Sequence, residues 1–304
     1  MFKRWGALIL CLVSVLSFSA CGSTQKGENQ AKTTDAGKVK VSVTFNAIKE
    51  FTQAVGGDKV EISTIIPDGI EPHDFEPKAQ DLVGLSAAQV FVYHGFGMES
   101  WVDDAVSAAG NKNLIIVEAS SGAEPITNTN EEEHGQYDPH LWLSLKGAET
   151  EAKNIKDALV KADPSNKDYY EANCSDFVSK LENLFNEYNK KFESVQKKSF
   201  VTGHAAFAYL CRDFGLNQNS VEDVFAEGEP SAQQLTELIK YCKESNVTTI
   251  FAEEMASPEV SQTLANEVGA EVETIYTVES AEDDMTYMDR MADNLSKIYI
   301  SLTK

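Results

Sequence analysis

Short apolar runs rich in β-branched residues recur along the chain and alternate with longer stretches whose apolar residues have helical spacing. Such runs are typical of buried strands, and helices between them favour parallel pairing. The runs form two groups. They are Val39–Phe45, Val60–Ile66, Val90–Tyr93 and Leu114–Val117 in the first half, and Phe200–Thr202, Ser220–Phe225, Thr248–Phe251 and Val272–Tyr276 in the second. We therefore predict an α/β fold of two lobes, each with a mainly parallel sheet.

A long segment without Gly or Pro separates the two groups, from Ser165 to Thr202. Its apolar residues recur at spacings of three and four, which predicts one amphipathic helix over residues 166–196. They are Phe177, Leu181, Leu184, Tyr188, Phe192 and Val195. This helix would join a lobe at residues 38–165 to a lobe at residues 197–304. Because a helix is a stiff linker, we do not expect a large hinge closure.

Capping residues predict two helix N-termini in the second half of the chain. Ser231 with Gln234 forms a capping-box pattern, and Ser257-Pro258 places an N-cap residue before a proline at the first helical position.

The N-terminus has the pattern of an export signal. Lys3 and Arg4 precede an apolar run that is too short to span a bilayer, and small residues follow it up to Cys21. We predict a signal peptide at residues 1–20. Phe18-Ser19-Ala20-Cys21 resembles a bacterial lipobox, in which the cysteine is lipidated, and ordinary cleavage after Ala20 is the alternative. Residues 21–37 would then be a polar tether that holds the protein on the outer face of the cell membrane.

The chain is strongly acidic. It has 26 Lys and Arg against 48 Asp and Glu, a net charge of −22. Removing residues 1–20 leaves 24 basic residues against the same 48 acidic ones, so the mature charge is −24. This balance argues against nucleic acid as a partner, because few Lys and Arg side chains are available to neutralise phosphates. Acidity is compatible with a cationic ligand but is weak support for one.

Three cysteines follow the tether, namely Cys174, Cys211 and Cys242. In an exported protein an odd number leaves at least one thiol unpaired. We expect buried, inert thiols, with a Cys211–Cys242 bridge as the alternative.

Three of the five histidines lie in loops or at strand ends. His73 follows the second predicted strand between prolines, His140 lies in Asp138-Pro139-His140-Leu141-Trp142-Leu143, and His204 follows the strand that ends at Thr202. Glu279 lies shortly after the last predicted strand. Three imidazoles and one carboxylate suit a divalent cation such as Zn²⁺. Each of these residues has an ordinary structural alternative, and spacing alone does not bring the four together.

Several segments resemble the zinc/manganese ABC-transporter substrate-binding proteins. The metal-ligand motifs of that family are similar to Gly69–Pro77, Asp138–Leu143 and Gly203–Tyr209, and further family segments match Gly97–Trp101, Glu229–Ala232 and Ile250–Glu253. The similarity covers essentially the whole chain after the tether. It implies two α/β lobes joined by one long helix, with the metal between them. It also implies a monomer, not an enzyme, that captures extracellular metal and delivers it to a membrane permease with its ATPase.

The third motif distinguishes the metal. Zinc-specific members of the family have His where manganese-specific members have Glu, and His204 occupies that place. The resemblance therefore implies Zn²⁺, with Mn²⁺ as the alternative. The fourth ligand in the family is an acid in the last loop, or water. Glu279 aligns best, although the usual Pro-Leu before it is Thr277-Val278 here. Glu282, Asp283 and Asp284 are the alternatives.

The other two histidines are not expected to be ligands. Many zinc-specific relatives carry a His-rich acidic loop, but residues 128–137 hold Glu131, Glu132 and Glu133 with only His134. We expect this segment to be a solvated loop rather than a cation-attracting one. His94 occupies a position that is commonly Asn in relatives, and we expect it to be structural or near the rim of the site.

Two other functions compete with metal capture. A secreted zinc hydrolase would need an open coordination position and a general base, and the chain contains neither HExxH nor GxSxG. An adhesin or scaffold is the other competitor, and no sequence feature selects it.

Overall fold

The computed structural model describes residues 37–128, 135–224, 231–253, 259–281 and 284–304. Several predictions concern residues outside these ranges: the signal peptide, lipidation of Cys21, the tether up to residue 36, His134, the N-cap at Ser257-Pro258, Glu282 and Asp283. Within the described ranges, no helix has both the length and the hydropathy that crossing a bilayer requires.

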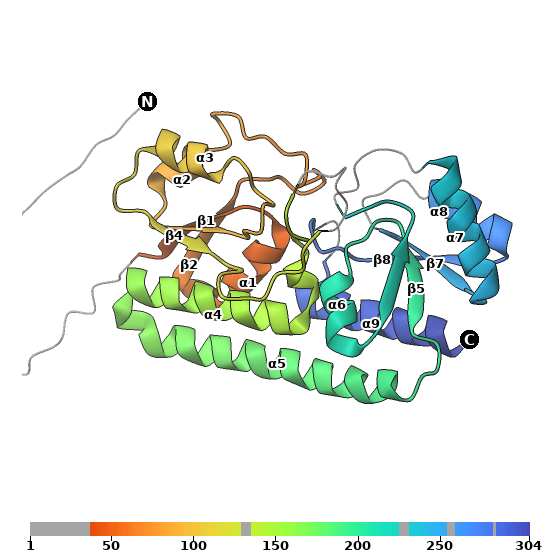
Figure 1. Cartoon of the computed structure of the whole chain (residues 1–304). Coiled ribbons are helices and arrows are strands. Elements are labelled where there is room, and N and C mark those ends of the chain that lie inside the picture. Colours follow the sequence, from red (N-terminus) through yellow and green to blue (C-terminus); the bar gives the residue numbers. More distant parts are fainter. Residues whose placement is uncertain (1–36, 129–134, 225–230, 254–258, 282–283) are drawn as a thin grey trace, which may run out of the picture. The chain divides into compact units, whose positions relative to one another are not determined.

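The first lobe is a parallel sheet with helices packed on it (Figure 1). The sheet order is β2-β1-β3-β4, and Val39 of β1 pairs with Val60 of β2. The strands are β1 (Val39–Val43), β2 (Val60–Thr64), β3 (Val90–Tyr93) and β4 (Ile115–Glu118). The helices are α1 (Asn46–Gly56), α2 (Val83–Ala87), α3 (Val102–Ala109) and α4 (Leu145–Ala162).

The second lobe repeats this topology. Its sheet is also parallel, with the order β6-β5-β7-β8. The strands are β5 (Ser199–Thr202), β6 (Asn217–Ser220), β7 (Thr249–Glu253) and β8 (Glu271–Ile275). The helices are α6 (Ala208–Phe214), α7 (Ala232–Glu244), α8 (Glu259–Val268) and α9 (Tyr287–Thr303). The predicted fold class is therefore confirmed. In each sheet the chain order reverses beside the first strand, and ligands of open α/β sheets bind at the carboxyl ends of the strands there.

One predicted strand was wrong. Of the predicted strand at Ser220–Phe225, only Ser220 belongs to β6, which consists of the polar residues Asn217–Ser220; residues 221–224 form no strand, and Phe225 lies outside the described residues. β6 lies at the edge of the sheet and pairs only with β5. An edge strand is held by backbone hydrogen bonds on one side and needs no continuous apolar run.

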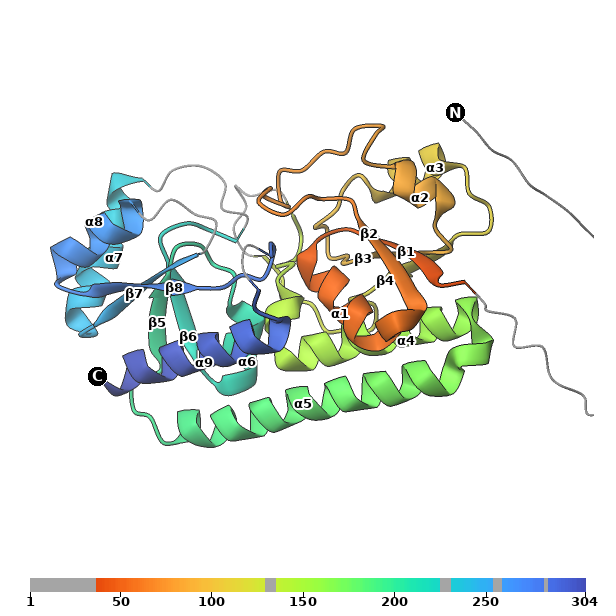
Figure 2. The same cartoon turned by 180° about the vertical axis from the view of Figure 1, so that it is seen from behind.

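The long helix α5 (Lys167–Glu193) runs along both lobes, as Figures 1 and 2 show from opposite sides. It packs on α1 and α4 of the first lobe and on α6 and α9 of the second. Its buried face includes Phe177, Leu181, Tyr188 and Phe192, as the periodicity predicts. The helix ends three residues before the predicted residue 196, so Val195 is buried in the connection that follows.

The main apolar core continues from one lobe into the other. It includes β1 and β3, the buried faces of α4, α5 and α9, and Phe207 and Phe251 of the second lobe. A separate small cluster lies under α7 and α8, around Leu238 and Leu264. Because the lobes share one core, separating them would expose apolar surface.

The three described cysteines are free and buried, so the expected inert thiols are confirmed and the alternative Cys211–Cys242 bridge is wrong. Cys211 belongs to the main core and Cys242 to the small cluster, and burial raises the pKa of the Cys242 thiol to about 11. The predicted capping box of Ser231 and Gln234 is confirmed at the start of α7.

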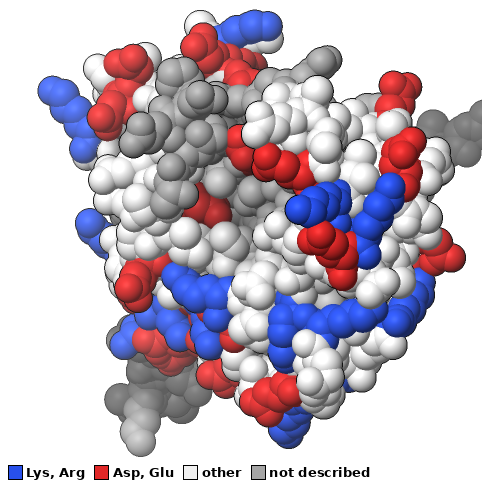
Figure 3. All heavy atoms as spheres, turned by 45° about the vertical axis from the view of Figure 1, so that its right-hand side comes forward, with Lys and Arg blue, Asp and Glu red and all other residues white. Residues whose placement is uncertain are grey.

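The acidity of the chain does not produce a uniform acidic surface on the face shown in Figure 3. Lys and Arg side chains alternate there with Asp and Glu side chains. The net charge therefore gives little information about the ligand.

Candidate metal centre

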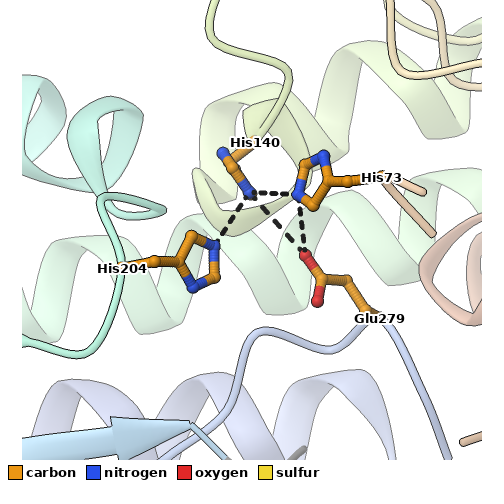
Figure 4. A group of neighbouring side chains, drawn as sticks. All are labelled: His73, His140, His204 and Glu279. Carbon is orange, nitrogen blue, oxygen red and sulfur yellow. Dashed lines mark hydrogen bonds and ion pairs between the residues drawn. The ribbon is translucent and has the colours of Figure 1, made fainter. Parts of the chain in front are cut away.

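The structure brings the four predicted ligand residues together (Figure 4). His73 lies in the loop after β2, and His140 precedes a short 3₁₀ turn at Leu141–Leu143. His204 is separated from β5 only by Gly203, and Glu279 lies in the loop after β8. His73, His204 and Glu279 thus lie in loops that follow the carboxyl ends of parallel strands, and these loops meet at the boundary between the lobes.

The distances match a tetrahedral ligand set. The Nε2 atom of His140 lies 3.1 Å from that of His73 and 3.3 Å from that of His204. The Oε1 atom of Glu279 lies 3.6 Å from His73 Nε2 and 3.7 Å from His140 Nε2. One atom from each of the four side chains fits within 4.8 Å of the others. A tetrahedral zinc with bonds of 2.0–2.1 Å has ligand–ligand edges of about 3.3 Å, so small adjustments would complete the geometry.

The cluster is buried. The His140 and His73 side chains are 0% and 2% exposed, and that of Glu279 is 2% exposed. Water is therefore largely excluded from the space between the ligand atoms.

A carboxylate orients His140. Both its backbone N–H and its Nδ1 lie within hydrogen-bond distance of Asp138 Oδ1, at 2.8 and 2.9 Å. A proton on Nδ1 that is donated to Asp138 leaves the lone pair of Nε2 directed at the cluster. The Tyr209 hydroxyl of α6 donates to the Asp138 carbonyl at 2.7 Å, so the second lobe supports this loop as well.

His204 is held by Glu253 at the end of β7. The His204 backbone N–H donates to Glu253 Oε1 at 3.0 Å, and Nδ1 lies 3.6 Å from the same oxygen. The preceding Gly203 makes this approach available, because a Cβ there would lie 1.9 Å from Glu253 Oε2. This contact explains why the motif has glycine before histidine.

The two oxygens of Glu279 have different environments. The Thr277 hydroxyl donates to Oε2 at 2.9 Å, while Oε1 faces His73 and His140. Thr277 therefore fixes the rotation of the carboxylate.

The electrostatics of the cluster couple the carboxylate to the imidazoles. Burial alone would raise the pKa of Glu279, but its hydrogen bond and charge interaction with His73 lower that pKa to about 2. Burial alone would lower the pKa of His73, but Glu279 and Glu71 raise it above its usual value. Burial and the neighbouring His140 lower the pKa of His204 to about 3. Glu279 is thus ionised and His204 neutral at physiological pH, as metal ligands must be.

Glu71 lies beside this cluster. Its Oε1 accepts a hydrogen bond from the His73 backbone N–H at 3.2 Å. Burial and the charge of Glu279 raise the pKa of Glu71 to about 7. A second carboxyl group therefore lies at the edge of the site, and its pKa depends on the charge of Glu279.

The other candidates lie elsewhere. His94 is fully buried, and its Nδ1 lies 2.7 Å from Glu151 Oε1, outside the ligand cluster. Asp284 is exposed. His94 therefore has the structural environment that we expected.

Sequence reasoning did not assign roles to Asp138, Glu253 and Thr277. Asp138 and Thr277 each precede a ligand residue by two positions, which is a usable signal for a residue that orients it. Glu253 is 49 residues from His204, and the parallel pairing of β5 with β7 brings the two close.

Comparison with known proteins gives the family. A family model described as "Zinc-uptake complex component A periplasmic" matches residues 41–300. The chain belongs to this family. It is 37% identical to the high-affinity zinc uptake system protein ZnuA of Bacillus subtilis, over 99% of each chain.

Solved structures agree. A ZnuA deletion mutant with zinc bound has a TM-score of 0.78 and 32% identity, and the match covers 87% of this chain and 98% of that one. The laminin-binding protein Lmb of Streptococcus agalactiae, described as a bifunctional adhesin and metal transporter, has a TM-score of 0.80 and 34% identity, covering 87% of this chain and 99% of that one.

The burial of His94 generates a stability prediction. Replacing His94 by Ala leaves the Glu151 carboxyl group buried without its partner, which typically costs about 3 kcal/mol or more. We expect urea denaturation of the metal-free protein to show that loss in the free energy of unfolding. Lys180→Ala is the control, since it removes an exposed ion pair with Asp176 and should cost less than about 1 kcal/mol. Equal, small losses in both variants would contradict a structural role for the His94–Glu151 pair.

Proposed function

We propose that this protein captures Zn²⁺ outside the cell and delivers it to a membrane ABC permease. The observation that carries the proposal is the buried set of three imidazole nitrogens and one carboxylate oxygen within 4.8 Å of one another. We assign His73, His140, His204 and Glu279 as the ligands. Membership of the zinc-uptake family supports the assignment, and so does the orientation of His140 by Asp138.

The donor set favours zinc over manganese. Imidazole nitrogens suit Zn²⁺, whereas Mn²⁺ is a harder cation that prefers carboxylate and water oxygens. His204 supplies the third imidazole, and no second carboxylate is in the set. The zinc-bound structure of a related ZnuA supports the same choice.

The same geometry supports binding rather than catalysis. A catalytic zinc normally has three protein ligands and one open position for water. Here four side chains would fill the tetrahedron. A secreted hydrolase would need one of them to leave the metal.

The remaining parts of the proposal concern location and partners. We propose that Cys21 carries a lipid and that residues 22–37 connect it to the first lobe. The protein would then act as a monomer on the outer face of the membrane, beside its permease and the ATPase of that permease. We also propose that the first lobe ends at residue 165 and that the second lobe begins at residue 197.

A metal-competition titration tests the function directly. We expect the soluble protein without residues 1–21 to bind about one Zn²⁺ per chain and to bind Mn²⁺ far more weakly, because three of the four ligand atoms are imidazole nitrogens. An equal or stronger preference for Mn²⁺ would contradict the zinc assignment.

Ligand replacements test the site. The binding free energy of a four-ligand zinc site is of order 10–16 kcal/mol, so removing one ligand should weaken binding by about 100-fold or more. We expect this loss for His204→Ala in an equilibrium competition with a zinc chelator. His134→Ala is the matched control and should have no effect. If Glu279→Ala retains the original affinity, water or another acid occupies the fourth position.

The pH dependence of binding follows from the charge of His73. Its pKa is raised in the metal-free protein, so this imidazole is still protonated somewhat above its usual titration range. Zinc requires the neutral form. As the pH is lowered, affinity should therefore begin to fall while the pH is still above ~6.5, and below the raised pKa it should fall about tenfold per pH unit. Titration calorimetry in buffers of different ionisation enthalpy would measure the released proton. His204 should add no competing proton above pH ~5, because its pKa is about 3. Zinc binding without proton release at pH 6.5 would contradict this account.

A further inference from the structure

Asn46 contacts three consecutive residues of the loop that carries Glu279. It is the first residue of α1, three positions after the end of β1, and it is 1% exposed. Its backbone N–H donates to the Glu279 carbonyl at 3.4 Å. Its side-chain Nδ2 lies 3.3 Å from the carbonyl oxygens of both Val278 and Ser280. One side chain of the first lobe thus holds the backbone on both sides of a ligand residue from the second half of the chain.

Further hydrogen bonds attach the same loop to the first lobe. Trp142 Nε1 donates to the Thr277 carbonyl at 2.7 Å. The Gly69 N–H donates to Ser280 Oγ at 2.7 Å, and the Ala281 N–H donates to Asp68 Oδ1 at 3.3 Å. Gly69 and Asp68 belong to the loop that carries His73. The Glu279 loop is therefore bonded to the elements that position His73 and His140.

The attachment continues into the start of α9. Glu50 of α1 accepts hydrogen bonds from Asn46 Nδ2 at 3.1 Å, from Arg290 Nη1 at 2.9 Å and from the backbone N–H of Tyr287. Arg290 is 1% exposed, so this ion pair is largely shielded from water. Both ends of the segment from Thr277 to Tyr287 are thus tied to α1 and its neighbours.

The loop backbone is strained at the residue before Glu279. Val278 has φ = 62°, a left-handed conformation that is unfavourable for a β-branched residue, and its side chain is fully buried. Such a conformation costs about 1–3 kcal/mol and persists where surrounding contacts enforce it. The hydrogen bond from Asn46 to the Val278 carbonyl is one of those contacts.

His204 is attached differently. Its backbone N–H is bonded to Glu253, and its carbonyl accepts hydrogen bonds from Thr202 and Gln218, all in the second lobe.

We propose that Asn46 is a positioning residue for Glu279, and that the first lobe thereby presents His73, His140 and Glu279 as a preassembled set. The second lobe then adds His204. This inference rests on the proposed function, since it assumes that the four residues bind the metal. Glu279 follows β8 of the second lobe in sequence, but hydrogen bonds hold its loop on the first lobe.

A double-mutant cycle tests the inference. If Asn46 acts through Glu279, Asn46→Ala should lower Zn²⁺ affinity about 10- to 100-fold, the usual loss when a residue that orients a ligand is removed. In the Glu279→Ala background the same change should alter affinity less than about twofold, because no carboxylate remains to be positioned. Thr52→Ala is the matched control. It removes a buried polar group from the same helix and should leave affinity within about twofold.

Ser280→Ala provides a second variant with a milder change, in case Asn46→Ala fails to fold. It removes the acceptor for the Gly69 N–H and should also weaken zinc binding, again only when Glu279 is present. The visible absorption of bound Co²⁺ gives an independent readout. Both variants should shift it toward the spectrum of Glu279→Ala.

The outcomes separate the two proposals. If His204→Ala and Glu279→Ala both bind zinc normally, the ligand assignment itself fails. If they lose affinity while Asn46→Ala and Ser280→Ala bind as tightly as the original protein, only the positioning role fails. It also fails if either variant loses the same affinity with and without Glu279, since the effect then does not pass through the carboxylate.

Discussion

The shared apolar core across α5 and α9 is the constraint on which the rest of the structure depends. Each sheet alone would place its loops at its own carboxyl edge, and nothing in one sheet determines where the other edge lies. Because α5 packs on helices of both lobes and α9 packs against α5 and β5, the two edges are held at one boundary. Four side chains, of which successive members are 64 to 75 residues apart in sequence, can then converge within 4.8 Å.

Burying these side chains together has an electrostatic cost, and interactions among neighbouring side chains of the site offset it. A buried carboxylate is unfavourable unless charge or hydrogen bonds compensate it. Without metal, Glu279 interacts with His73, and the Thr277 hydroxyl binds its second oxygen. Under the proposed function, a divalent cation would place a stronger positive charge than a proton between the same side chains. The contacts that stabilise the metal-free cluster would then also favour binding of the ion.

The sequence could predict the parts of the fold that depend on local pattern or on motifs. The long amphipathic face from Phe177 to Phe192 gave α5, and the loop motifs gave His73, His140 and His204. β6 could not be predicted this way, because its residues Asn217–Ser220 are polar and are held by pairing with β5. Asn46 was missed for a related reason. Its partners at residues 278–280 are more than 230 positions away, and a buried Asn at a helix start has no distinctive local pattern.

The same core limits how the ion can enter and leave. Moving one lobe away from the other would expose apolar side chains on α5 and α9 and would break the bond between Glu50 of α1 and Arg290 of α9. Each CH₂ group exposed to water costs about 0.8 kcal/mol, so such a motion is expensive even over a few side chains. The loop with His73 carries less buried apolar surface: Ile70 is 45% exposed, and the segment from Pro67 to Gln80 contains no regular helix or strand. Segments with few buried contacts open at lower free energy than core helices. Local movement of this loop would break the Gly69–Ser280 and Ala281–Asp68 hydrogen bonds but would expose little of the apolar core, so it is the less costly route to the four clustered side chains.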